Sequence, residues 1–301
     1  MKTKIKYESL KRAKNIENAK RAYKKYAKDI DEPIELQIYD DLDRFFHKEK
    51  YPPVGAIHGV TSLYYSFRAI YNLKSEYKCQ LYDDMETTFQ YLRMGAIYHA
   101  MAYDALQWES QKNQVDGDYI NDIETHEGFL YQAISVNEWK LAQENSYPCP
   151  IIQAMLNEEY GEAKELLLAY TEEPDESQEP YFIHMPYVKQ IYFAILNRDE
   201  NEFNEQLAKR INKYRKRPSD YQPVIDTTSI ALIKMAGKLG LQYRFRVEEI
   251  PEYFLEVKEP IERSDCKIMD LEKCRQAFEK WGDNAPSLDE IKTKLFRACS
   301  H

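Results

Sequence analysis

The side chains of this chain that are best suited to catalysis or metal binding are its histidines and the acidic residues near them. Six histidines occur, at positions 47, 58, 99, 126, 184 and 301, and no two stand four residues apart, so the helical zinc motif HExxH is absent. His99 and Asp104 share one apolar helical stretch with Tyr103 and Glu109. Such a grouping is either a catalytic site or a set of satisfied polar core groups, and the second is the commoner case. We therefore predict no catalytic residues.

The chain also lacks the motifs of phosphate-binding loops, dinucleotide-binding sites and serine hydrolases, which are GxxxxGK, GxGxxG and GxSxG. Its five cysteines show neither a CxxC pair nor zinc-type spacing: Cys79, Cys149, Cys266, Cys274 and Cys299. An odd number of scattered thiols is typical of a reducing compartment. Lys2, Lys4 and Lys6 are not followed by the apolar core of a secretory signal. We expect a cytoplasmic protein that is not an enzyme and has no cofactor and no metal site.

One acidic cluster indicates binding rather than catalysis. Residues 171–180 read TEEPDESQEP, and their carboxylates are Glu172, Glu173, Asp175, Glu176 and Glu179. A calcium loop needs a glycine at a sharp turn and regularly spaced oxygens, and Pro174 interrupts this segment. Two interpretations remain: a surface that meets Lys and Arg of a protein partner, or a solvated loop between two helices. These five residues are our candidate partner-binding site.

The charge distribution favours a basic protein as that partner. The net charge is −9, and residues 1–28 hold eleven Lys or Arg against Glu8 and Glu17, so the rest of the chain carries −18. Nucleic-acid phosphates repel an acidic surface, whereas complementary fields speed the encounter with a basic protein. We expect no direct contact with nucleic acid. No apolar run approaches the ~20 residues of a membrane span, so we expect no membrane contact either.

A sequence segment that occurs twice, 40 residues apart, indicates that helices position these residues. Residues 154–167 read AMLNEEYGEAKELL and residues 194–207 read AILNRDENEFNEQL. In each copy a helix ends in Leu-Asn, two charged residues follow, and a second amphipathic helix begins. This period is the length of a two-helix repeat unit. We expect Leu156 and Leu196 to point into a shared core.

The rest of the chain fits an all-α fold: a multi-helix bundle that continues into stacked αα-hairpin (solenoid-like) repeats. Glycine is scarce, with 9 residues, and residues 59–77 and 83–111 are apolar enough to form buried helices. Further helices are expected at 7–30, 33–48, 224–239, 270–281 and 288–299. A polar break at 113–126 divides an N-terminal bundle (1–125) from a helical-repeat region (126–301), or the two form one continuous domain.

Helix boundaries follow from capping residues. Ser135 and Glu138 fit a capping box that opens a short helix through Trp139. Asp226 is expected to cap the helix that Gly240 closes.

The C-terminal half resembles a known family. From residue 191 it reads IYFAILNRDENEFNEQLAKRINKYRKRPSDYQPVIDTTSIALIKMAGKLGLQYRFRVEEIPEYFL. This order of helix, charged turn, basic helix end, Asp, and apolar helix ending in Lys-Leu-Gly-Leu is similar to the immunity protein 49 family of bacterial toxin–immunity systems. The similarity covers about residues 150–255. It implies an all-α protein that binds and neutralises a cognate toxin, such as a basic nuclease, and it supplies no catalytic residues.

Two rival interpretations stay open. The chain is a helical-repeat scaffold or adaptor for another protein partner, or it is an enzyme with a site in the central bundle around His99 and Asp104. A toxin gene beside the gene for this chain favours the immunity function over the scaffold. A deep pocket that joins His99 to Asp104 favours the enzyme.

Overall fold

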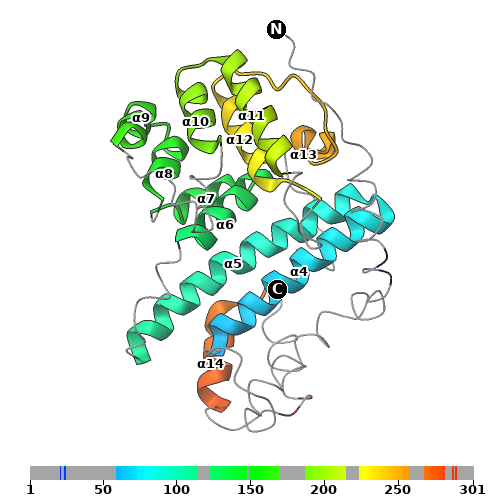
Figure 1. Ribbon diagram of the computed structural model, residues 1–301. Helices are drawn as coiled ribbons and strands as arrows, with labels where there is room; N and C mark the ends of the chain where they lie inside the picture. The colour runs from blue at the N-terminus through cyan, green and yellow to red at the C-terminus, as the bar shows by residue number, and fades with distance from the viewer. Residues whose placement is uncertain are drawn as a thin grey trace. The chain divides into compact units, whose positions relative to one another are not determined.

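The computed structural model describes residues 59–113, 123–147, 149–169, 187–214, 224–257 and 268–281, together with Arg21, Lys24, Ser287 and Asp289. Its regular elements are α-helices (Figure 1), so the predicted all-α fold is confirmed. An isolated bridge joins Val247 to Ile250. The expected helices 7–30, 33–48 and 288–299 fall outside the described residues, apart from single positions.

The described helices group into two compact units. One unit contains α6 (Ile123–Ser135), α7 (Trp139–Glu144), α8 (Pro150–Leu156), α9 (Tyr160–Ala169), α10 (Val188–Leu196), α11 (Glu200–Tyr214), α12 (Thr227–Lys238) and α13 (Glu252–Glu256). The other contains most of α4 (Gly59–Tyr82), α5 (Met85–Asn113) and α14 (Leu271–Trp281).

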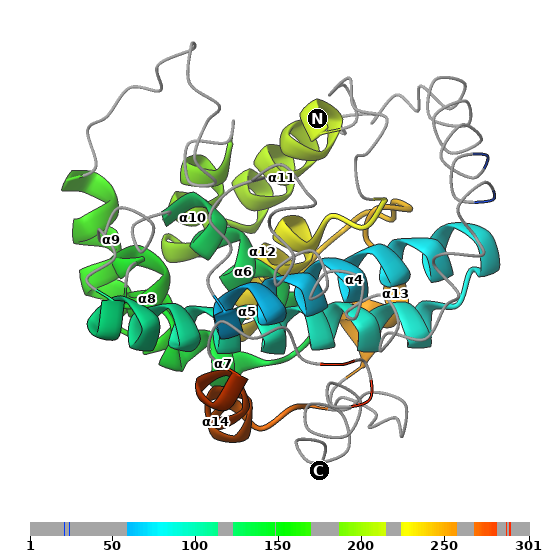
Figure 2. The same cartoon turned by 90° about the horizontal axis from the view of Figure 1, so that it is seen from below.

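In the second unit, α4 and α5 lie side by side and pack through aromatic rings (Figure 2). The ring of Tyr98 on α5 stacks on Phe67 with centroids 4.6 Å apart and on Tyr71 at 5.7 Å. From α14, Cys274 and Trp281 join the same buried cluster. The expectation of buried helices at 59–77 and 83–111 is therefore confirmed, and aromatic pairs of this geometry stabilise such a core beyond their area alone.

In the first unit, the repeated phrase forms two helical hairpins, α8–α9 and α10–α11, as predicted. The turn between α8 and α9 is a Schellman motif, which ends a helix with one left-handed residue. Glu158 has φ 64° and donates its N–H to Met155 O (3.3 Å), and Glu159 donates to Ala154 O (2.9 Å). The carbonyl of Glu159 then accepts the N–H of Ala163 (2.9 Å), so α9 begins at once.

The turn between α10 and α11 repeats these bonds 40 residues later. Arg198 has φ 56°, its N–H donates to Ile195 O (3.0 Å), and the N–H of Asp199 donates to Ala194 O (2.9 Å). Asp199 also caps α11, because its carboxylate accepts the N–H of Glu202 (3.0 Å).

A third copy of this turn, which the sequence did not reveal, joins α6 to α7. Asn137 has φ 64° and donates its N–H to Ile134 O (3.1 Å), and Glu138 donates to Ala133 O (2.9 Å). The predicted capping box at Ser135 and Glu138 is wrong. Ser135 is the last residue of α6, its hydroxyl donates to Gln132 O (2.7 Å), and Glu138 makes no side-chain cap bond.

Each hairpin contacts a later segment of the chain through the same position of its second helix. This position is the fifth residue after the one that precedes the helix. The three contacts are Gln143 Nε2 to Asn157 Oδ1 (2.9 Å), Lys164 Nζ to Asn197 Oδ1 (2.7 Å) and Asn204 Nδ2 to Gln242 O (2.8 Å). The Asn of each Leu-Asn pair thus accepts a bond from the preceding hairpin. This stacking explains why the repeat retains an asparagine there.

The helix α12 packs against both α6 and α10. It therefore contacts the first hairpin in chain order (α6–α7) as well as the third (α10–α11). Asp226 caps it as predicted, since its carboxylate accepts the N–H of Ser229 (3.0 Å). Gly240 ends it with φ 83°. Of the two repeat leucines expected in the core, Leu156 is buried, whereas Leu196 is only half-buried.

Candidate protein-binding surface

His99 and Asp104 do not form a joint site. The His99 side chain is buried on α5 and its ring meets the edge of Tyr65 at a centroid distance of 5.8 Å. Asp104 is exposed one and a half turns further along the same helix. Five positions correspond to about 140° around a helix, so the two side chains point in different directions. The geometry that would favour the enzyme interpretation is not present at this pair.

A second buried polar cluster joins α6 to α10 and to the start of α8. The hydroxyls of Tyr131 and Tyr192 lie 2.9 Å apart, and both rings are fully buried. Burial raises the pKa of the Cys149 thiol, and the carboxylate of Glu127 raises it further. Burial likewise raises the pKa of both tyrosines. The thiol and the phenols stay protonated at neutral pH, so Cys149 is a packing residue and not a thiolate nucleophile.

His126 has a structural role in the same unit. Its Nε2 atom lies 2.5 Å from the carbonyl oxygen of Asn145, which ties the start of α6 to the end of α7. Burial lowers the pKa of this imidazole, and the hydrogen bond to Asn145 opposes that effect. The neutral ring therefore donates from Nε2 at physiological pH.

Arg210 is a residue that the sequence interpretation missed. Its guanidinium pairs with the carboxylate of Asp226 and with the hydroxyl of Ser229, and all three side chains are buried. The pair connects α11 to the first turn of α12. The signal was present in the spacing, because Phe203, Leu207, Arg210 and Ile211 fall on one helical face, where an arginine needs a buried acid.

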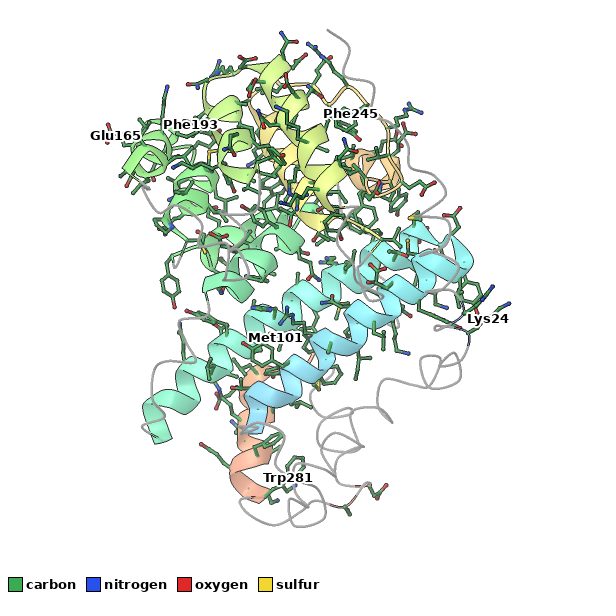
Figure 3. All side chains as sticks on the ribbon, in the orientation of Figure 1. Lys24, Met101, Glu165, Phe193, Phe245 and Trp281 are labelled. Carbon is green, nitrogen blue, oxygen red and sulfur yellow. The ribbon has the colours of Figure 1, made fainter. Side chains whose placement is uncertain are left out.

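The repeat helix α9 is largely exposed. Only Ala163 and Leu167 of this helix are buried. Carboxylates are exposed along the α8–α9 hairpin: Glu158, Glu159, Glu162 and Glu165. Figure 3 shows Glu165 on the outer side of α9. Near the end of the helix, 60% of Leu168 is exposed.

This combination makes the hairpin a candidate interaction surface. An apolar side chain set beside charged groups is the usual arrangement of a protein interface, with an apolar contact inside a polar rim. The sequence indicated an exposed apolar residue here through the run Leu166-Leu167-Leu168, because three consecutive helical residues cannot all face one core.

The predicted partner-binding residues Glu172, Glu173, Asp175, Glu176 and Glu179 lie outside the described residues. They follow the C-terminal end of α9 in the chain, so the described acidic hairpin leads directly into that segment. Their role stays a prediction.

Within the described ranges, His, Cys, Asp and Glu side chains form no group of three that could hold a metal ion. None of the helices that the structure describes combines the length and apolar composition of a membrane span. In comparisons with known proteins, no family model, no curated protein and no solved structure matched the chain.

Proposed function

We propose that the protein binds a cognate bacterial toxin in the cytoplasm and neutralises it by covering part of its surface. The observation that supports this most directly is α9, an exposed repeat helix with acidic residues along it and Leu168 near its end. Occlusion requires affinity and shape and no chemistry of its own. The resemblance to the immunity protein 49 family supplies the class of partner.

The charge of the hairpin fits a basic toxin surface. Glu158, Glu159, Glu162 and Glu165 are countered on the described part of the hairpin only by Lys164. A nuclease that binds phosphates carries a basic site, and an acidic inhibitor offers carboxylates in place of those phosphates. Leu168 provides the apolar contact that is desolvated in the complex.

The test starts with co-expression of this chain and the product of the neighbouring gene. Co-purification, together with loss of that product's toxicity in cells, is the expected outcome. A neighbouring product that binds but is not toxic would favour the scaffold or adaptor function instead. If the two proteins do not associate, the proposal is wrong for this pair.

A variant pair then tests the surface. Glu165→Lys combined with Leu168→Asp should weaken binding about tenfold or more, since one central apolar contact and one favourable charge are lost. Glu256→Lys is the matched control, because Glu256 is also exposed at a helix C-terminal end, on α13. Equal affinity of both variants for the toxin would exclude α9 from the interface.

A further inference from the structure

The turn between α6 and α7 differs from the other two hairpin turns in its burial. Glu158 and Arg198, the left-handed residues of the second and third turns, are exposed. In the first turn, Ser135 and Val136 are fully buried and Asn137 is half-buried. All three turns share the same backbone bonds, so the difference comes from what covers the first one.

The first turn is covered by α12 and by the end of α13. Lys234 on α12 places its Nζ 2.7 Å from Ser135 O and 2.6 Å from Asn137 Oδ1. The amide nitrogen of the same side chain, Asn137 Nδ2, donates a hydrogen bond to Val257 O (2.5 Å). One asparagine therefore joins the turn to α12 and to the residue after α13.

A second lysine of α12 reaches the same hairpin one turn later. The Nζ of Lys238 lies 4.1 Å from the centroid of the Trp139 ring, at the start of α7. Lys234 and Lys238 are four residues apart and lie on one face of the helix. A cation over an indole face is a favourable contact, and with the Lys234 bonds it gives α12 two points of attachment.

The burial of the Lys234 amine is energetically costly, which argues for a specific role of this side chain. Its amine is largely removed from water, and burial lowers the pKa of the amine to about 7. A buried amine destabilises a fold unless acceptors are placed to receive its hydrogen bonds. Here a main-chain carbonyl and a side-chain amide oxygen do so.

We propose that α12 is a strap that closes the hairpin stack, with Lys234 and Lys238 fastening it across the α6–α7 turn. A linear stack of hairpins contacts only its neighbours, and a hairpin at its end opens independently. Because α12 contacts α6 as well as α10, it joins the first hairpin to the third. The fastened strap makes the three hairpins open together, and a released strap lets α6–α7 open alone.

Hydrogen exchange read by mass spectrometry tests the strap in the full-length chain. Lys234→Met retains the apolar stem and removes the amine. In this variant, amides of residues 123–144 should exchange about tenfold faster relative to those of α10–α11, the change expected when a buried hydrogen-bonded contact is lost. The matched control is Lys140→Met in the same hairpin, whose side chain is 87% exposed. Its exchange should match that of the unmodified chain.

A second variant distinguishes the loss of the Lys234 contact from a general loss of stability. Asn137→Asp keeps an oxygen within reach of Lys234 and adds a charge partner for the amine, so it should keep α6–α7 protected even though the bond to Val257 is lost. Equal acceleration of both hairpins in Lys234→Met would overturn the strap, and so would unchanged exchange in α6–α7. A faster α6–α7 hairpin in Asn137→Asp, equal to that in Lys234→Met, would also contradict the assignment of Lys234 as the fastening group.

Discussion

At the scale of single residues, Lys234 predicts how stability depends on pH. Burial lowers the pKa of its amine from 10.5 to about 7. Between pH 7 and 9 the unfolded chain keeps this proton and the folded chain does not, so the free energy of unfolding rises with pH. Each pH unit contributes about 1.4 kcal/mol, so the rise due to Lys234 approaches ~2–3 kcal/mol over this window. Urea unfolding at pH 7 and pH 9 measures it.

The variant Lys234→Met should remove this rise, and the exposed Lys140→Met should retain it. Above pH 9 the trend reverses, because burial raises the pKa of Cys149, Tyr131 and Tyr192. Once pH passes their ordinary values of 9.0 and 10.0, the unfolded chain loses these protons first and stability falls. Equal pH dependence of both lysine variants would show that Lys234 is not the group responsible.

A second residue-scale prediction concerns the buried pair of Arg210 and Asp226. Asp226→Ala leaves the guanidinium of Arg210 buried without its charge partner and should cost about 3–5 kcal/mol. The double variant Asp226→Ala with Arg210→Met should recover the part of that loss that comes from the unpaired charge, because no buried charge remains. The cap bond to the N–H of Ser229 stays lost in both variants. Denaturant unfolding of both variants measures the difference.

The control for this cycle is Glu252→Ala, which breaks the exposed pair of Arg246 with Glu252. It should change stability by less than about 1 kcal/mol. If Asp226→Ala behaves like this control, Arg210 and Asp226 do not form a buried pair in solution.

At the level of secondary-structure elements, the left-handed residues of the hairpin turns should limit the stability of the fold. A non-glycine residue in this conformation costs about 1–2 kcal/mol, and glycine does not have this cost. After allowance for the greater entropy of glycine in the unfolded chain, Glu158→Gly and Arg198→Gly should each raise stability by about 0.5–1 kcal/mol. Thermal unfolding detects such a gain.

Asn137→Gly distinguishes conformation from side-chain bonding at the equivalent position. It relieves the same backbone cost, with φ 64°, but loses the bonds to Val257 and Lys234, so stability should fall. A gain in all three variants would mean that the side chain of Asn137 contributes nothing.

The hairpins illustrate what sequence patterns predict and what they miss. Leu-Asn followed by two charged residues identified two turns, because the helices on either side kept their apolar spacing. The turn between α6 and α7 was missed because it needs only a left-handed residue and backbone bonds, and Ser135-Val136-Asn137 satisfies that need with other residue types. Ser135 looked like an N-cap because serine fits either end of a helix. The half-burial of Leu196 depends on tertiary packing, which spacing alone does not determine.

At the scale of the whole molecule, charge patterning indicated a binding surface but not its place. The net charge of −9 and the acidic run at 171–180 were evident in the sequence. The exposure of α9 was not, because the same amphipathic pattern left α11 with six buried residues and α9 with two. The difference arises from neighbours: α9 packs on α8 and α10, whereas α11 also contributes Arg210 to the buried pair at the start of α12. The spacing of α11 places Arg210 on the inward face, but it does not identify Asp226 as the partner of Arg210.

The carboxylates of the acidic hairpin should set the rate at which the proposed toxin associates with it. Charges at the rim of an interface act mainly on association, and salt screens them over a Debye length of ~8 Å at physiological ionic strength. Glu162→Lys with Glu165→Lys replaces two exposed carboxylates on α9 by cations. Stopped-flow binding should show slower association at low salt and a flatter salt dependence, while dissociation changes less. Reversal of Glu172, Glu173, Asp175, Glu176 and Glu179 to Lys should act in the same direction if that segment also faces the toxin.

The comparison of rates, rather than of affinities alone, identifies the cause. Glu256→Lys changes the net charge by the same amount per site on α13. If it slows association as much per charge as the α9 reversals do, the effect comes from the overall field of the protein and not from a docking surface. If only the α9 variants slow association, and the difference disappears at high salt, the carboxylates of α9 face the toxin during encounter.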